Sequence, residues 1–316
     1  MSVSGIWNNA KYVGAAAALT CLVMSGCSAE DPDTASKAKS SHASSGEIPK
    51  VEQNDELRNR LPEKILDADE VVSVNSGSFP PYIVVGSVEG DISGATADLE
   101  KALEQLWGIG ITENTVDGLS SELTGISAGR YDMAFGPVGD FKERQNKNDF
   151  IDYVQEFVVF AVQKGNPKKI EDVASTCGLK IAVQAGGSAE KVIKDQSKEC
   201  ESDGDKAIEV MSFKDQPQSI LSVQSGRSDA FFSSRAPLTY FVEESDGKLE
   251  LAGTESKNGF DTLYQGAVVP KDSEMGPVLE DSLNELFENG TYEAIMKKWK
   301  LGANAIDKPG KNLAVN

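Results

Sequence analysis

Residues 123–152 read LTGISAGRYDMAFGPVGDFKERQNKNDFID, and this stretch indicates the fold of the chain. Their first part ends an amphipathic helix at residues 128–130, because glycine accepts the left-handed conformation found at many helix ends. Residues 131–135 predict a short buried strand that stops at Gly136-Pro137, since proline interrupts regular structure. The polar run that follows starts another helix around Arg144. An arginine shortly after the carboxyl end of a strand lies where open α/β sheets bind ligands.

The same pattern occurs again later in the chain. Residues 218–224 predict a helix that ends in Ser225-Gly226-Arg227, and the strand SDAFF follows at residues 228–232. This arrangement repeats the order found at residues 127–135, which read SAGRYDMAF. A helix, a glycine–arginine turn and a strand that occur twice indicate two similar α/β lobes.

Length and charge narrow the function classes. At 316 residues the chain can bury one large core or two moderate ones. Its formal net charge of −19 argues against a nucleic-acid partner, because phosphate binding needs basic clusters. The single histidine, His42, lies in a low-complexity segment, which argues against histidine triads and histidine metal sites. The glycine turn at Gly186 lacks the Walker lysine and the G-x-G-x-x-G spacing, so no cofactor is expected.

The first 26 residues predict an export signal. Lys11 supplies a positive charge, and VGAAAALTCLVM at residues 13–24 is an apolar run too short to span a membrane. This run leads into Met24-Ser25-Gly26-Cys27, which resembles a bacterial lipobox, so Cys27 is expected to carry a lipid anchor. The alternative is plain secretion, with Cys27 incidental.

Residues 27–50 are expected to form a flexible tether. They are rich in serine, alanine, lysine and aspartate without an apolar period, so they cannot bury enough surface to fold. Such a tether gives a folded domain reach from the membrane. The protein is therefore expected at the extracellular face of the cell membrane, anchored by lipid.

The order of the motifs resembles the extracellular solute-binding proteins, family 3, which serve polar amino-acid ABC importers. In that family a helix, an SGKYD-like turn, a strand and a small-residue loop lead to T-x-x-R and then to F-S-D-P-Y. The matching segments here are SAGRYD at residues 127–132, Glu143-Arg144, FIDY at 150–153, VQAGGSAE at 183–190, YQGAVVPK at 264–271, NGTY at 289–292 and Lys298-Trp299. The resemblance covers about residues 55–301.

This resemblance implies an α/β fold of the two-lobe, type II periplasmic-binding-protein kind, with a hinge and a cleft between the lobes. Lobe I would consist of residues 51–158 and 262–306, lobe II of residues 159–261, and residues 307–316 would be a C-terminal tail. The apolar run at residues 157–162 favours a buried strand, and in the family such a strand crosses from one lobe to the other.

The resemblance also implies a ligand site. Arg144 would hold a carboxylate through its bidentate fork, unless it forms a surface ion pair on its helix. Ser188 and the backbone of Gly187 would share this anion at a helix N-terminus. Tyr82, which follows Pro80-Pro81, would cover the ligand side chain, unless it is a core residue. The small-residue loop would add Gly136 and Gly139 to the site.

The residue that binds the α-ammonium is where this chain departs from the family. The family has an aspartate there, and this chain has Ser234, followed by Arg235. A buried ammonium without a carboxylate would cost several kcal/mol. Either another acid replaces the aspartate or the ligand is not a simple α-amino acid, and Arg235 would favour a ligand richer in carboxylates if it faces the cleft. The candidate acids are Asp215, Glu190 and Asp261.

Cysteine usage predicts one disulfide. Apart from Cys27, the expected mature chain contains Cys177 and Cys200. An even number of cysteines outside the cytoplasm favours a disulfide, and no C-x-x-C motif supports a redox role. Closing this loop should contribute roughly 3 kcal/mol in the chain-entropy model.

These features together predict a lipid-anchored solute-binding protein that delivers a carboxylate-bearing ligand to ABC permease subunits. The family resemblance implies that it is a monomer. The ligand would be an amino acid or a derivative. One alternative is a ligand-sensing lipoprotein, which needs the same cleft. Another is an enzyme on the same fold, which needs a general acid or base in the cleft. The sequence identifies no catalytic residue and no metal site.

Overall fold

The computed structural model describes residues 48–88 and 90–314. The expected export signal, the expected lipidation site Cys27 and most of the expected tether lie outside the described residues. Within the described part, no helix is both long enough and apolar enough to cross a membrane.

Lobe I is built around a four-stranded antiparallel sheet with the strand order β13-β6-β12-β5. A parallel pair, β1 and β4, adjoins this sheet where Ser73 forms a bridge with Met133. The strands are β1 (Glu70–Asn75), β2 (Val84–Val85), β3 (Ile92–Ser93), β4 (Gly110–Thr115), β5 (Ala134–Gly139), β6 (Asn148–Glu156), β12 (Leu263–Pro270) and β13 (Ala305–Lys311). The helices are α1 (Asp55–Arg58), α2 (Glu63–Ala68), α3 (Ala95–Trp107), α4 (Leu119–Ser127), α5 (Lys142–Gln145), α9 (Met275–Glu288) and α10 (Thr291–Lys298).

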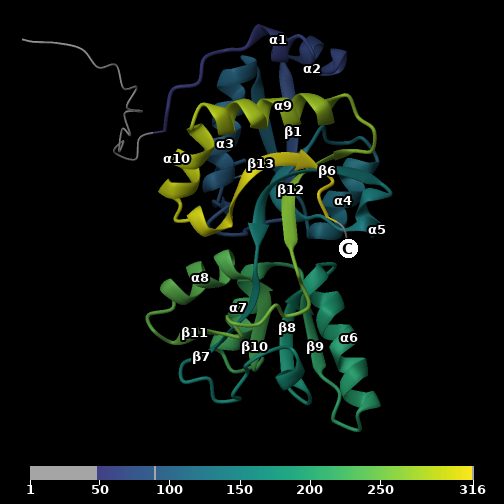
Figure 1. The fold of residues 1–316 in the computed structure, drawn as a ribbon, viewed down its shortest axis with the longest axis vertical. Helices are drawn as coiled ribbons and strands as arrows, with labels where there is room; N and C mark the ends of the chain where they lie inside the picture. The colour runs from purple at the N-terminus through teal and green to yellow at the C-terminus, as the bar shows by residue number, and fades with distance from the viewer. Residues whose placement is uncertain (1–47, 89, 315–316) are drawn as a thin grey trace, which may run out of the picture. The chain divides into compact units, whose positions relative to one another are not determined.

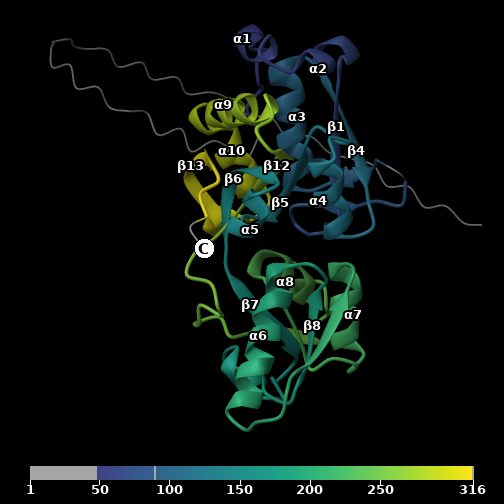
Figure 2. The ribbon, with the colours of Figure 1, turned by 90° about the vertical axis from the view of Figure 1, so that its right-hand side faces the viewer.

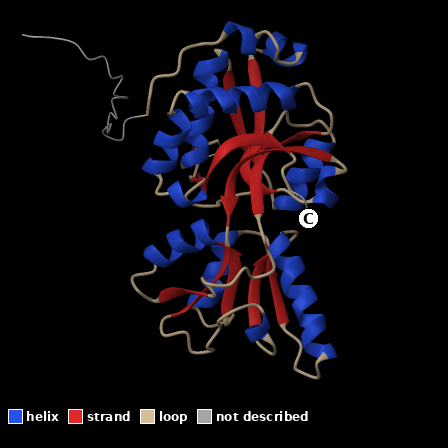
Figure 3. Ribbon diagram, in the orientation of Figure 1, coloured by secondary structure: helices blue, strands red, loops and turns tan. Residues whose placement is uncertain are grey.

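Lobe II is built around a five-stranded sheet with the order β11-β7-β10-β8-β9. Strands β10, β8 and β9 run parallel, and β7 runs antiparallel to both of its neighbours. The strands are β7 (Val158–Gln163), β8 (Lys180–Gln184), β9 (Glu209–Phe213), β10 (Ala230–Ser234) and β11 (Leu249–Ala252). The helices are α6 (Ser188–Ser202), α7 (Gln216–Gln224) and α8 (Arg235–Glu243). Figure 3 shows strands with helices around them in both lobes.

Two chain segments connect the lobes. The first passes directly from β6 to β7 at Phe157, and the second leads from β11 back to β12. Figure 1 shows both connections, the first in teal and the second in green. Two connections of this kind allow hinge motion between the lobes.

Alternating side chains build the cores. Along β7, Val158, Phe160 and Val162 pack into one apolar cluster of lobe II, whereas Val159 and Ala161 pack into another. This is the period of two expected for a strand buried on both faces. Helix α6 packs on the first of these faces, and α7 and α8 pack on the second, an arrangement that can be followed in Figure 2. The continuous apolar run at residues 157–162 therefore marks the central part of lobe II.

The stretch at residues 123–152 contains one correction to the sequence prediction. Helix α4 ends at Ser127, and Gly129 adopts a φ of +68°. This is the left-handed helix end that the glycine in the sequence predicted. The strand that follows, however, starts at Ala134 and continues through Gly136 and Pro137 to Gly139. The prediction that no regular element passes through this pair is wrong. Since β5 is at the edge of its sheet, a missing N–H group at Pro137 does not interrupt pairing with β12.

The C-terminal residues also differ from expectation. Residues 305–311, most of which were expected to be a tail after lobe I, form β13 and pair with β6. The strand lacks an alternating apolar pattern because it lies at an edge, where backbone pairing and polar contacts suffice. Asp149 anchors it, since its carboxylate accepts hydrogen bonds from Lys271 and Asn312 and forms an ion pair with Lys311.

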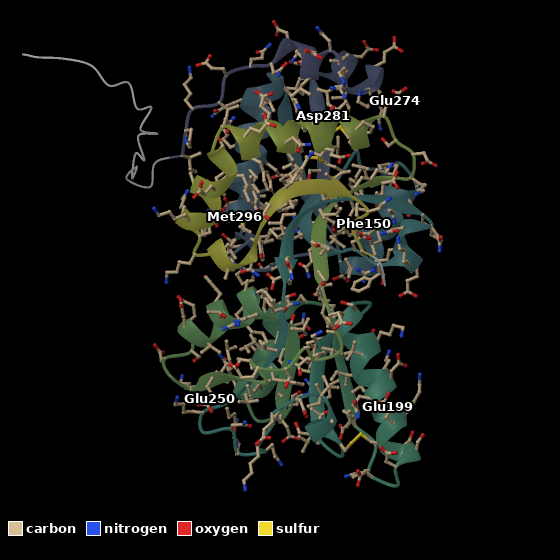
Figure 4. All side chains as sticks on the ribbon, in the orientation of Figure 1. Phe150, Glu199, Glu250, Glu274, Asp281 and Met296 are labelled. Carbon is tan, nitrogen blue, oxygen red and sulfur yellow. A yellow bond between two sulfur atoms is a disulfide. The ribbon has the colours of Figure 1, made fainter. Side chains whose placement is uncertain are left out.

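The expected disulfide is confirmed. Cys177 and Cys200 are bonded, with a Cα–Cα distance of 5.7 Å. The bond links the segment before β8 to the last turn of α6, and Figure 4 shows it as a yellow bond near Glu199.

Candidate functional site

A cavity of about 90 Å³ lies between the two lobes. A single water needs about 10–15 Å³ on the same measure, so a group of several heavy atoms fits. Its lining from lobe I comprises residues 75–79, Ile83, Leu119, Glu122, residues 136–139 and Arg144. Its lining from lobe II and the connections comprises Val158, Gln184, residues 187–189, Gln216, Ser233, Ser234, Leu263 and Gln265.

Strand ends position several of these lining residues. Residues 76–79 follow the carboxyl end of β1, Gln184 ends β8, and Ser233 and Ser234 end β10. The carboxyl ends of parallel strands are the usual ligand-binding edge of an open α/β sheet. In this protein such edges from both lobes contribute to one cavity.

Arg144 connects the two lobes. Its Nη1 donates a hydrogen bond to the Gly139 carbonyl at 2.7 Å, and its Nη2 donates to the Gly186 carbonyl of lobe II at 3.0 Å. The guanidinium stacks over the Phe141 ring at 5.0 Å. Burial lowers the pKa of Arg144, and nearby carboxylates, chiefly Glu122, oppose this shift. A guanidinium has five N–H donors and stays charged, so donors remain for an anionic ligand.

The start of α6 faces the same cavity. Gly187 is the N-cap of α6, Ser188 is its first residue, and no side chain caps the helix. Gly186 has a φ of +75°, and its N–H group donates to Glu190 Oε2 at 2.9 Å. First-turn N–H groups have no acceptor within their own helix, so this end of α6 can hold an anion.

Amide and hydroxyl side chains form two hydrogen-bonded groups in the cavity lining. Gln216 Nε2 donates to Gln184 Oε1 at 2.8 Å, and Ser233 Oγ donates to Gln216 Oε1 at 3.0 Å. Gln265 Nε2 donates to Ser234 Oγ at 3.2 Å. Among the residues described, Gln265 Oε1 is buried and has no hydrogen-bond partner. Buried acceptors are normally satisfied, so this oxygen is available to a donor on a ligand.

The structure places Tyr82 away from the cavity. Its ring is buried in the core of lobe I, and its hydroxyl donates to Glu156 Oε1 at 2.6 Å. Phe79 lines the cavity instead and stacks on Tyr82, with 5.7 Å between the ring centroids. The other six residues expected to bind ligand line the cavity. They are Arg144, Ser188, Gly187, Gly136, Gly139 and Ser234.

None of the three acids considered as replacements for the missing aspartate lines this cavity. Asp215 caps α7 by accepting from the Gln218 N–H at 2.8 Å. Glu190 is bound by Lys194 at 2.8 Å, and Asp261 pairs with Lys257. Arg235 is exposed and also lies outside the cavity lining.

Glu122 is the acid that the sequence analysis missed. It lies on α4 with Leu119, Leu123 and Ile126, at the i, i+3, i+4, i+7 spacing of a helix face that packs inward. Its side chain lines the cavity and the residue is 2% exposed. Burial raises the pKa of Glu122 to about 7, although a hydrogen bond with Ser76 acts in the opposite direction. The signal in the sequence was a glutamate at an apolar position of a helix.

Two hinged α/β lobes around a polar cavity define a binding protein of the type II periplasmic class. A family model described as bacterial extracellular solute-binding proteins, family 3, matches residues 71–302. The chain belongs to this family, which confirms the family and the fold class expected from the motifs.

Relatives and solved structures agree with this assignment. The chain is 26% identical over 254 residues to the arginine-binding protein ArgT of Corynebacterium glutamicum, covering 80% of this chain and 81% of that protein. It is 23% identical over 227 residues to the L-cystine-binding protein TcyJ of Escherichia coli, covering 71% and 79%. The structure of AbpA from Streptococcus pneumoniae bound to L-arginine has a TM-score of 0.67 at 20% identity, covering 76% and 99%. An ancestral arginine-binding protein bound to arginine has a TM-score of 0.65 at 24% identity, covering 73% and 98%.

Proposed function

We propose that this protein captures a small α-amino acid, or a close derivative, and delivers it to an ABC importer. The observation that carries the proposal is the convergence of Arg144 and the uncapped start of α6 on one cavity between two lobes. A fixed guanidinium and a helix N-terminus both favour a carboxylate. The names of the relatives, which include binding proteins for arginine and cystine, support an amino acid as the ligand class.

The carboxylate would bind where the two lobes meet. Arg144 belongs to lobe I and already donates to Gly186 of lobe II, so a carboxylate beside it would contact both lobes. Gly187 and Ser188 would donate from the start of α6, and Gly136 and Gly139 would form the wall on the side of β5. A ligand that contacts both lobes favours the closed arrangement, because it binds that arrangement more tightly than the open one.

The rest of the ligand would face polar groups and one aromatic ring. Ser234 and Gln265 would contact its polar atoms, and Gln265 Oε1 would accept from one of them. Phe79, rather than Tyr82, would cover its apolar part.

The proposed location follows from the N-terminal sequence. Residues 1–26 would direct export, Cys27 would carry the lipid, and residues 27–50 would tether the lobes to the extracellular face of the membrane. The monomeric protein would then dock on permease subunits. The family description, which names extracellular proteins, supports this location.

We also propose that the protein binds its ligand without converting it. The named relatives are binding proteins, although one solved neighbour is described as an ancestral amino-acid-binding protein that is a precursor of cyclohexadienyl dehydratase. Recovery of an unchanged ligand after prolonged incubation is the expected result, and turnover would contradict it. Co-purification with permease subunits would favour transport over sensing.

The test is thermal unfolding of the purified protein against the standard amino acids, dicarboxylates and amines. A ligand at 100 times its Kd should add roughly 2.7 kcal/mol of stability, which is a shift of several degrees. Arg144→Lys keeps the charge but not the planar fork, so the shift should shrink or vanish. Arg227→Lys is the matched control, because Arg227 stacks on Phe213 at 5.4 Å and lies outside the cavity lining. Absence of a shift with every α-amino acid would contradict the proposal.

A further inference from the structure

We infer that the carboxylate of Glu122, in lobe I, binds the ammonium group of the ligand in place of the family aspartate that Ser234 replaces in lobe II. The inference rests on the amino-acid ligand proposed above. It assigns a binding residue at a position outside the motifs that carry the family resemblance, and it defines the ligand class as zwitterionic rather than purely anionic.

The surroundings of Glu122 carry the inference. The residue is 2% exposed and lines the same cavity as Arg144 and Ser188. Within the described ranges, no lysine or arginine nitrogen lies within 4.0 Å of its carboxylate. A buried carboxylate without a cationic partner is unfavourable, and a cation that enters from the cavity would offset this cost. An ammonium group is such a cation.

The arrangement of charges matches an α-amino acid. Glu122 and Arg144 influence each other's ionisation without forming an ion pair, so opposite charges stand close together on the lobe I side of the cavity. The carboxylate and ammonium of an α-amino acid are likewise adjacent and opposite in charge. A dicarboxylate would instead place its second anion near Glu122, where the like charges repel. The cavity should therefore prefer amino acids to dicarboxylates that lack an amine.

Binding should be coupled to loss of a proton. Three groups face Glu122 from neighbouring elements: Ser76 after β1 and Arg144 of α5, which favour its charged form, and Glu113 of β4, which opposes it. Burial is the largest influence and raises the pKa of Glu122 to about 7. A bound ammonium favours the carboxylate and lowers this pKa, so binding at pH 7 should release about half a proton. Affinity should accordingly fall as the pH drops below 7.

Isothermal titration calorimetry with the twenty standard L-amino acids, one by one, tests the inference on wild-type protein and two variants. Glu122→Gln preserves shape and removes the charge, and at pH 8 it should weaken binding at least about 30-fold. Glu100→Gln is the matched control, because Glu100 is also a buried lobe I glutamate whose pKa is raised by burial, but it does not line the cavity. Its affinity should equal that of the wild type.

A second readout separates binding from a structural role. Titrations at pH 7 in phosphate and in Tris should reveal proton release for wild type and Glu100→Gln, and none for Glu122→Gln. If the wild type binds an amino acid and Glu122→Gln binds it equally tightly, or if wild type and Glu122→Gln release protons equally, this inference is overturned while the proposed function stands. If the wild type binds none of the amino acids, the proposed function itself fails, and this inference fails with it.

Discussion

Replacing Glu122 with glutamine should stabilise the ligand-free protein at neutral and alkaline pH. Burial raises the pKa of Glu122 from an ordinary value of 4.5 to about 7, so folding favours its neutral form. Below pH 4.5 the side chain is neutral in both the folded and the unfolded state, and it has no ionisation cost. Above pH 7 it is charged in both states, and burying the charge disfavours folding by the full difference. At 1.36 kcal/mol per pKa unit, this difference is about 3 kcal/mol.

Thermal unfolding at pH 4 and pH 8 measures this effect. Glutamine carries no charge, so Glu122→Gln should raise Tm by roughly 6 to 10 °C at pH 8 and leave it nearly unchanged at pH 4. Glu199→Gln is the control, because Glu199 is exposed near the end of α6, and it should show no such dependence on pH (Figure 4). A gain in Tm that is equal at both pH values, or a loss at pH 8, would refute the argument. A change that stabilises the ligand-free protein and weakens ligand binding is the pattern expected of a functional residue.

Two further predictions concern parts of the protein outside the cavity. Reduction of the bond between Cys177 and Cys200 should lower stability by roughly 3 kcal/mol, measured as a lower Tm with dithiothreitol. Ligand affinity should stay unchanged, because the bond lies at the end of α6 opposite to the cavity. Burial alone would raise the pKa of Asp149, but hydrogen bonds from Lys271 and the other partners of the carboxylate hold this pKa well below 3.8. The charged Asp149 therefore stabilises the fold above pH 3.8, and this stabilisation is lost as the pH falls further. Asp149→Asn should therefore cost about 2 kcal/mol in urea unfolding at pH 7 and progressively less below pH 4, whereas a loss of stability that is independent of pH would contradict this account.

Local sequence patterns predicted the secondary structure correctly where the tertiary structure places no additional constraint on it. The apolar run at residues 157–162 indicated a buried strand because every residue in it is apolar, and residues 158–162 form most of β7. The strand, the glycine turn and the helix start at residues 180–190 could also be predicted from the sequence. Positive φ at Gly186 and the start of a helix depend on nearby residues alone. The family resemblance then pointed to the turn before α6, and Gly187 and Ser188 there line the cavity.

The misjudged features depend on long-range neighbours. Pro137 lies inside a strand because that strand is at a sheet edge, a fact that the residues around Pro137 do not reveal. Phe79 and Tyr82 are both aromatic, and only the path of the loop decides which one faces the cavity. Glu122 departs from the apolar pattern of its helix, and only the tertiary structure places its side chain in the lining of the cavity.

A crystal structure of the complex with an α-amino acid identified in the binding screen tests the central claim most directly. The account predicts a ligand between the lobes, with its carboxylate bound by Arg144 and the start of α6. Its ammonium nitrogen should lie within hydrogen-bond distance of Glu122, at about 3 Å. A ligand outside this cleft, or one whose ammonium is held in lobe II while Glu122 contacts only protein, would contradict it.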